Sequence, residues 1–179
     1  MRRAELERLL PGVVQRTVHP GDVLGAVLDA MEALHAPVED VLDHVEQVAD
    51  PWLAPDQLVP YLATWVDLGW LLTDDPHAPA GAVRTLPSGH GALRSLVAAG
   101  AWLAAWRGTE KGLVRLLELA TGLTGFQVDE RPADADGRRL PFHLVVVAPP
   151  GAEAYQDLVR LIVSTEKPAW LTSEVRFSF

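Results

Sequence analysis

The sequence predicts an α+β fold, in which an N-terminal helical region is followed by a small C-terminal β-β-α-β unit packed on the 109–122 helix. Up to Gly122, apolar residues recur every three or four positions, which is typical of amphipathic helices. After it, short β-branched and alternating segments flank one more helical segment. We therefore expect a helical region over 1–106, with a long loop at 73–91, and an α+β subdomain over 107–179.

The first helices are expected to form a hairpin. Asp22, after a Pro-Gly pair, is a plausible N-cap for a periodic apolar stretch over 23–34. Pro37 should break or kink that helix. A second periodic stretch at 38–48 follows and ends at Asp50-Pro51, so two amphipathic helices joined by a short bend are predicted.

Two more helices complete the first region. The stretch 56–66 is helical in pattern, with Pro60 either in its first turn or kinking it. The segment 73–91 is rich in Pro, Gly, Asp and Ser, so it predicts a loop that contacts a partner or is mobile. The stretch 93–106 is apolar on most sides, which is typical of a central helix.

The segment 107–122 predicts a tight turn and a capped helix. Gly108 permits a sharp reversal of the chain, and the Thr109 hydroxyl can accept a hydrogen bond from a free N–H of the next helix. Gly112 is costly inside a helix, by roughly 1 kcal/mol against alanine, so another backbone should pack closely there. Gly122 is a suitable C-cap. The expected buried stripe is Leu113, Leu116, Leu117 and Ala120.

The C-terminal pattern alternates between strands and a helix. A short strand should begin at 126–128, and the polar segment 131–139 reads as a hairpin loop. The β-branched run 144–147 predicts a strand covered on both faces. A helix over 155–163 should end at a Lys-Pro pair, and the alternating tail 171–179 predicts a half-buried strand.

Composition restricts the possible partners. The net charge is −9, which argues against a nucleic-acid binder because such proteins need basic surface to release counterions. Solvated acidic surface is the simpler interpretation, and a partner with a basic face is the alternative. There are no cysteines, which fits a reducing cytoplasm. No secretory signal is apparent, and the longest apolar run, about eleven residues at 96–106, is too short to span a membrane.

No catalytic or metal-binding constellation emerges from the sequence. The cluster at 107–112 departs from a phosphate-binding loop, because Lys111 precedes Gly112 and no Ser or Thr follows it. Asp40 and His44 could share a helix face, where a solvated charged surface is the simpler interpretation than a metal site. His143 is interpreted as a packed or hydrogen-bonded side chain. We therefore expect no enzyme activity and no cofactor.

Tryptophan content suggests contacts with other proteins. The chain has six tryptophans, and core packing is expected to account for most of them. Tryptophan and arginine are also preferred anchors at protein interfaces. The candidate interaction residues are Trp65, Trp102, Trp106, Arg107, Gly108, Thr109 and Gly112.

Several motifs, in order, resemble the phage tail protein I family. The segment "RGTEKGL...LELATG" at 107–122 is similar to that family's arginine-glycine-threonine segment, and "LVPYLATWVDLGW" at 58–70 to its leucine- and tryptophan-containing segment. "LLPGVV" at 9–14 and "KPAWLTSEVRF" at 167–177 also resemble family segments. The chain departs from the family pattern after Lys-Pro-Ala, where Trp170-Leu171 replaces His-Thr, and in its longer 73–91 loop.

The resemblance implies a structural role as a baseplate wedge component of a contractile phage tail or phage-tail-like injection system. It implies that one copy clamps two copies of a larger wedge protein, and that the wedges link a spike hub to the sheath. The expected location is a particle assembled in the cytoplasm. Two alternatives are a small soluble enzyme or nucleotide-binding module centred on 107–112, and a free adaptor domain outside any particle.

Overall fold

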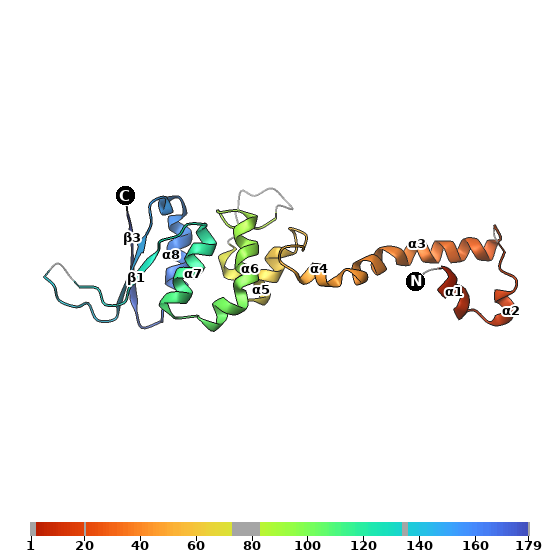
Figure 1. The fold of residues 1–179 in the computed structure, drawn as a ribbon, viewed down its shortest axis with the longest axis horizontal. Helices are drawn as coiled ribbons and strands as arrows, with labels where there is room; N and C mark the ends of the chain where they lie inside the picture. The colour runs from red at the N-terminus through yellow and green to blue at the C-terminus, as the bar shows by residue number, and fades with distance from the viewer. Residues whose placement is uncertain (1–2, 20, 73–82, 134–135, 179) are drawn as a thin grey trace. The chain divides into compact units, whose positions relative to one another are not determined.

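The computed structural model describes residues 3–19, 21–72, 83–133 and 136–178, which form two compact units, Met1–Gln47 and Val48–Phe179 (Figure 1). The predicted boundary between residues 106 and 107 falls inside the second unit, where the helices on either side of it pack together. That boundary stays a prediction.

The first unit is helical. It contains α1 (Arg3–Leu9), α2 (Gly12–Gln15) and α3 (Val23–Asp43), and a further helix, α4 (Val45–Ala49), starts at its end. The predicted cap is confirmed, since the Asp22 side chain accepts a hydrogen bond from the N–H of Gly25. Helix α1 packs on the beginning of α3, where Leu6 and Leu28 are buried and Arg3 pairs with Asp29 at 2.8 Å.

The predicted helical hairpin is wrong. Helix α3 continues through Pro37 to Asp43, so the two expected helices are one. A proline inside a helix removes one N–H donor, and here the remaining hydrogen bonds of a 21-residue helix keep it continuous. The apolar residues expected to bury against each other across a hairpin therefore lie along one helix, and Leu34 and Val38 remain exposed.

The second unit has a helical layer built around α6 (His90–Ala105). This helix packs against both α5 (Val59–Trp65) and α7 (Glu110–Thr121) (Figure 1). Its central position is confirmed, because Leu93 and Leu96 are fully buried. Pro60 lies in the first turn of α5 and does not kink it, which is the first of the two predicted alternatives. A 3₁₀ turn, η1 (Gly69–Leu71), follows α5.

The C-terminal sheet confirms the predicted α+β class. Strands β1 (Gln127–Asp129), β2 (His143–Ala148) and β3 (Thr172–Phe177) are arranged in that order, with β1–β2 antiparallel and β2–β3 parallel. A 3₁₀ turn, η2 (Ala152–Tyr155), and α8 (Gln156–Glu166) connect the parallel pair.

The packing of the sheet also agrees with the pattern in the sequence. Helices α7 and α8 lie side by side against the sheet (Figure 1). Strand β2 is buried at Leu144, Val145 and Val146, so consecutive side chains pointing to opposite faces are covered. Strand β3 alternates between exposed and half-buried residues. The predictions for these two strands are confirmed.

The predicted loop at 73–91 and the expected lack of a membrane span can be compared with the structure only over the described residues. Residues 73–82 of the predicted loop 73–91 lie outside the described residues. Near its end, Leu86 is buried, and the Ser88 hydroxyl donates a hydrogen bond to the carbonyl of Ala120 on α7. Within the described part of the chain, no helix has both the length and the apolar character needed to cross a membrane.

Candidate interaction surface

The hydroxyl group of Thr109 bridges the two sides of the bend between α6 and α7. Gly108 has a φ of +74°, a left-handed conformation that glycine adopts without steric cost. The Thr109 Oγ1 accepts a hydrogen bond from Gly112 N at 3.1 Å and donates one to the Trp106 carbonyl at 2.7 Å. The predicted Thr109 cap is therefore confirmed, and the same side chain joins the end of α6 to the start of α7.

Gly112 is explained by a close backbone approach. A Cβ atom at this position would lie 2.1 Å from the carbonyl oxygen of Trp106. The predicted approach of another backbone is confirmed, and the neighbour is the residue that caps α6 across the bend. Any side chain at residue 112 would force α6 and α7 apart at their junction.

Lys111 stacks on two indole rings. The ring centroids of Trp102 and Trp106 are 5.8 Å apart, with an angle of 31° between the planes. The Lys111 Nζ atom lies 5.3 Å from the Trp102 centroid and 4.4 Å from the Trp106 centroid. An ammonium group at this distance is attracted by the negative face of each ring. We call Trp102, Trp106 and Lys111 the Trp–Lys stack.

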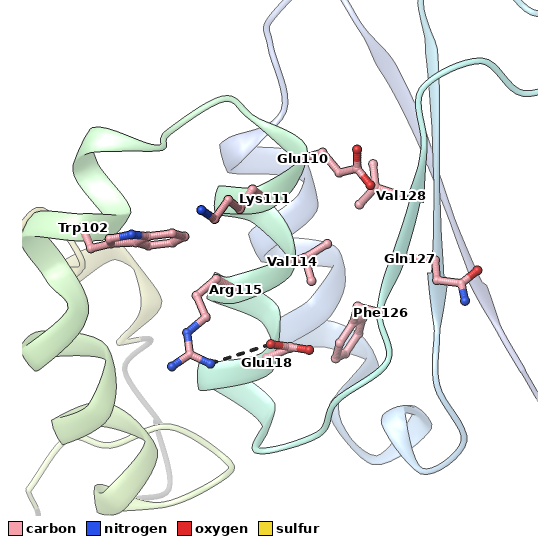
Figure 2. Close-up of a pocket in the computed structure, with 9 residues that line it drawn as sticks. All are labelled: Trp102, Glu110, Lys111, Val114, Arg115, Glu118, Phe126, Gln127 and Val128. Carbon is pink, nitrogen blue, oxygen red and sulfur yellow. Dashed lines mark ion pairs between the residues drawn. The ribbon is translucent and has the colours of Figure 1, made fainter.

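An open groove of about 760 Å³ runs beside this stack (Figure 2). Trp102 of α6 and Phe126 line it on opposite sides of α7, and Val114 of α7 lies between them (Figure 2). Arg115 and Glu118 are 3.8 Å apart within it. The groove thus combines apolar walls with charges of both signs, as protein-contact surfaces commonly do.

Arg107 holds three segments of the second unit together. Its Nη1 atom is 2.6 Å from Asp67 Oδ2, in the turn after α5, and its Nε atom is 3.4 Å from Glu166 Oε2 at the end of α8. The Glu166 side chain is only 9% exposed. Burial raises the pKa of Glu166, and the Arg107 guanidinium opposes that rise. Much of the donor capacity of Arg107 is therefore used inside the chain.

Trp65 belongs to a second aromatic patch. It stacks edge-on with Tyr61 on α5, with ring centroids 5.3 Å apart and planes at 64°. The structure thus gathers Trp102, Trp106 and the 107–112 segment around one bend, while Trp65 is paired elsewhere. Whether these residues contact a partner stays a prediction.

The expectation that most tryptophans pack in the core is wrong. Trp65 is 66% exposed, Trp170 is 71% exposed, and Trp52 and Trp106 also count as exposed. Only Trp70 and Trp102 are partly buried against the core. The small cluster of buried leucines and valines already fills the space between helices and sheet, so the larger indole rings remain at its margin.

The two histidines considered as possible site residues make hydrogen bonds within the chain. His44 Nδ1 lies 2.8 Å from the Asp40 carbonyl, one helical turn away. His143 Nδ1 lies 2.7 Å from Thr172 Oγ1, in agreement with its interpretation as a hydrogen-bonded side chain. Among the residues that the structure describes, no three His, Asp or Glu side chains are grouped so that they could hold a metal ion.

Several side-chain contacts of the candidate interaction residues are not predicted from the sequence. Tyr61 precedes Trp65 by four residues, a helical spacing that could have indicated the second patch. No regular spacing indicates the contact of Lys111 with the two indole rings, because Lys111 lies beyond the bend from Trp106. The contacts of Arg107 with Asp67 and Glu166 have no local signal, because they join residues 40 or more positions apart.

No protein-family model matches this chain, and no curated protein matches it either. The likeness to the phage tail protein I family therefore depends on the short motifs already described. Its implications for function are proposals.

Proposed function

We propose that this chain is a structural baseplate wedge subunit of a contractile injection system or phage-like tail. In that role it forms a hetero-oligomeric wedge with two copies of a larger baseplate protein and links the spike hub to the sheath. Its work is mechanical, since rearrangement of such wedges on target contact releases the sheath. The particle is assembled in the cytoplasm.

The observation that carries this proposal is the exposure of four of the six tryptophans: Trp52, Trp65, Trp106 and Trp170. An exposed indole leaves a large apolar area in water, which is unfavourable at roughly 25 cal/mol per Å². Tryptophan is enriched among the anchor residues of protein interfaces, so exposed indole rings favour contacts with partner proteins. The motif order at 58–70, 107–122 and 167–177 then favours a tail-wedge partner over others.

The geometry of the bend supports a structural role for its most specific motif. The Arg-Gly-Thr segment positions α6 against α7 through Gly108, Thr109 and the salt bridges of Arg107. Each of its three residues thus has a stated part in packing. A rigid junction of this kind suits a subunit that transmits force between neighbours.

The nucleotide-binding alternative has no contact in its favour. The N–H of Gly112, at the start of α7, is already bound by the Thr109 hydroxyl, and Lys111 faces indole rings. Titration calorimetry with ATP on the wild type and on Lys111→Met checks this alternative. Tight binding that disappears in the variant would establish it.

The proposed function is tested in cells that encode the chain. Particles are isolated by sedimentation and viewed by negative-stain electron microscopy, and the tagged chain is traced through the gradient. We expect the chain to co-sediment with sheathed particles, and deletion of its gene to leave tubes or sheaths without baseplates.

A double variant, Trp65→Ala with Trp106→Ala, examines the exposed anchors in the same assay. It should keep the fold, with some loss of stability because Trp106 is 39% exposed and Trp65 66%, but it should be depleted from particles. Leu158→Ala is the contrasting variant, since it opens a cavity in the core and should lower stability instead. Full assembly of particles in the absence of the gene would refute the proposal.

A further inference from the structure

Helix α3 carries a heptad repeat that the described chain leaves largely uncovered. Leucine, valine and methionine occur at spacings of three and four in strict alternation: Leu24, Val27, Met31, Leu34, Val38 and Val41. A repeat with a mean period of 3.5 residues keeps one seam facing a partner helix in a left-handed supercoil. We call these six residues the α3 seam.

Only the beginning of the seam is covered within the first unit. There α1 packs on α3, and Leu28 next to the seam is buried with Leu6. Farther along, Leu34 is 76% exposed, and Val38 and Val41 are 59% and 56% exposed. A helix whose seam is apolar and exposed over two heptads is typical of a strand of a coiled coil that lacks its partner.

The charges beside the seam distinguish among possible partners. Leu28 and Leu42 widen the seam on one side, and beyond them Glu32 and Glu39 lie seven residues apart on the same helix. Between residues 23 and 49 there are six carboxylates and no lysine or arginine: Asp29, Glu32, Glu39, Asp40, Asp43 and Glu46. Glu32 and Glu39 therefore border the seam with negative charge on one side, whereas Asp29 and Asp43 lie on the far side of α3.

A second copy of this chain is a poor occupant of the seam. In an antiparallel pair, the two rows of glutamates would face each other, and like charges at close range are repulsive. In a parallel pair, neither copy supplies a lysine or arginine to the other's glutamates. Self-pairing through α3 is thus repulsive in the antiparallel orientation, and in the parallel orientation it gains no opposite-charge contact beside the seam.

We propose that α3 pairs with a helix of a different protein that has an apolar heptad seam flanked by lysine or arginine. Opposite charges beside a coiled-coil seam determine the choice of partner, while the seam itself provides the apolar burial. This inference rests on the proposed function, which supplies neighbouring subunits, and it specifies the chemistry of the helix that one of them presents.

The inference is tested with the full-length chain and two designed fluorescent peptides of about four heptads. Both peptides have leucine and isoleucine in the seam, and they differ only in having lysine or glutamate at every flanking position. Fluorescence anisotropy should show the lysine peptide binding at least about tenfold more tightly than the glutamate peptide at low salt. High salt should reduce this difference because it screens the flanking charges.

Two variants of the full chain separate charge from apolar burial. Leu34→Asp with Val38→Asp should abolish binding of the lysine peptide, whereas Ala36→Asp, exposed on the opposite side of α3, should not. Glu32→Lys with Glu39→Lys should reverse the preference toward the glutamate peptide. Simple hydrophobic adhesion would not produce this reversal.

Three results would overturn the inference. Equal affinity for the two peptides would remove the role of charge. A stable dimer of the chain alone that dissociates in Leu34→Asp would make a second copy the occupant. A large fall in melting temperature in Leu34→Asp would show that the seam is covered by the chain itself. A peptide preference without particle assembly would refute only the proposed function, and assembly without the preference would refute only this inference.

Discussion

At the scale of single residues, two backbone positions determine the bend. Gly108 supplies the left-handed conformation, and Gly112 leaves room for the Trp106 carbonyl. The remaining side chain of the bend, Thr109, satisfies donors and acceptors on both sides of it. A motif that resembles a ligand loop in sequence is therefore used to join two helices.

Gly112→Ala should destabilise the chain by about 1–3 kcal/mol, because the new methyl group would overlap the Trp106 carbonyl oxygen. The gain of helix propensity from alanine, about 1 kcal/mol, works in the opposite direction and is smaller than the expected strain. Urea unfolding measures the difference.

Gly91→Ala is the matched control, since Gly91 also lies in a helix but has open space around its Cβ position. It should stabilise the chain by up to about 1 kcal/mol. Equal effects of the two substitutions would show that the close approach at Gly112 is not a constraint.

The free energy of unfolding should depend on pH through the ionisation of Glu166. Burial raises its pKa in the folded chain, so the folded state holds the proton more tightly than the unfolded state. Its contribution is present below the ordinary glutamate pKa of about 4.3 and is lost as the pH rises through the raised value. Unfolding free energies of wild type and Glu166→Gln, compared across that window, should diverge with increasing pH.

Glu174 provides a control of opposite sign. Its hydrogen bond with Arg176 lowers the pKa of Glu174, so its contribution is present above the ordinary value and is lost as the pH falls through the lowered one. Glu174→Gln should therefore remove a component that increases with pH. A Glu166→Gln variant with the same pH profile as wild type would contradict the assignment.

At the scale of elements, Arg107 connects the turn after α5, the bend and the end of α8 through Asp67 and Glu166. Arg107→Met should cost about 1–3 kcal/mol, because it leaves the nearly buried Glu166 carboxylate without its cation. Thermal unfolding monitored by circular dichroism measures this loss.

Arg115→Met is the control for Arg107→Met, because it removes a salt bridge that lies on the surface of α7. Arg115 pairs with Glu118 at 3.8 Å on the surface of that helix, and the arginine side chain is 52% exposed. Such a pair contributes about 0–1 kcal/mol. If both substitutions had equally small effects, Arg107 would not be the connection inferred here.

At the scale of the whole molecule, the core indicates which part folds independently. Every residue of the main buried cluster lies between Ala54 and Val163, and the second compact unit begins at Val48. A fragment of residues 48–179 should therefore unfold cooperatively, with a melting temperature within a few degrees of the same transition in the full chain. Differential scanning calorimetry of the two proteins measures this.

The fragment 107–179 tests the domain boundary expected from the sequence. It lacks α6, whose Leu93 and Leu96 are fully buried in the same core as α7. Loss of these side chains would expose the face of α7 that they cover, so the shorter fragment should be unfolded or aggregated. Independent folding of 107–179 would instead support the boundary between residues 106 and 107.

Local patterns were sufficient to predict most elements of the second unit. The alternation of the C-terminal tail predicts β3, the leucine spacing predicts the buried face of α7, and Thr109 and Gly122 predict its two ends. These features follow from side-chain periodicity and from hydrogen bonds between near neighbours. The α+β class follows from their order, because helices and strands differ in period.

Residues close together in the chain were thus enough to predict most helices and strands of the second unit and the roles of the two glycines in the bend. The folded chain was needed to show that α3 runs through Pro37, that four of the six indole rings are exposed, and that Arg107 meets Glu166. These outcomes depend on which distant surfaces fill the available volume. A proline, a tryptophan or an arginine is compatible with more than one such arrangement until the packing is known.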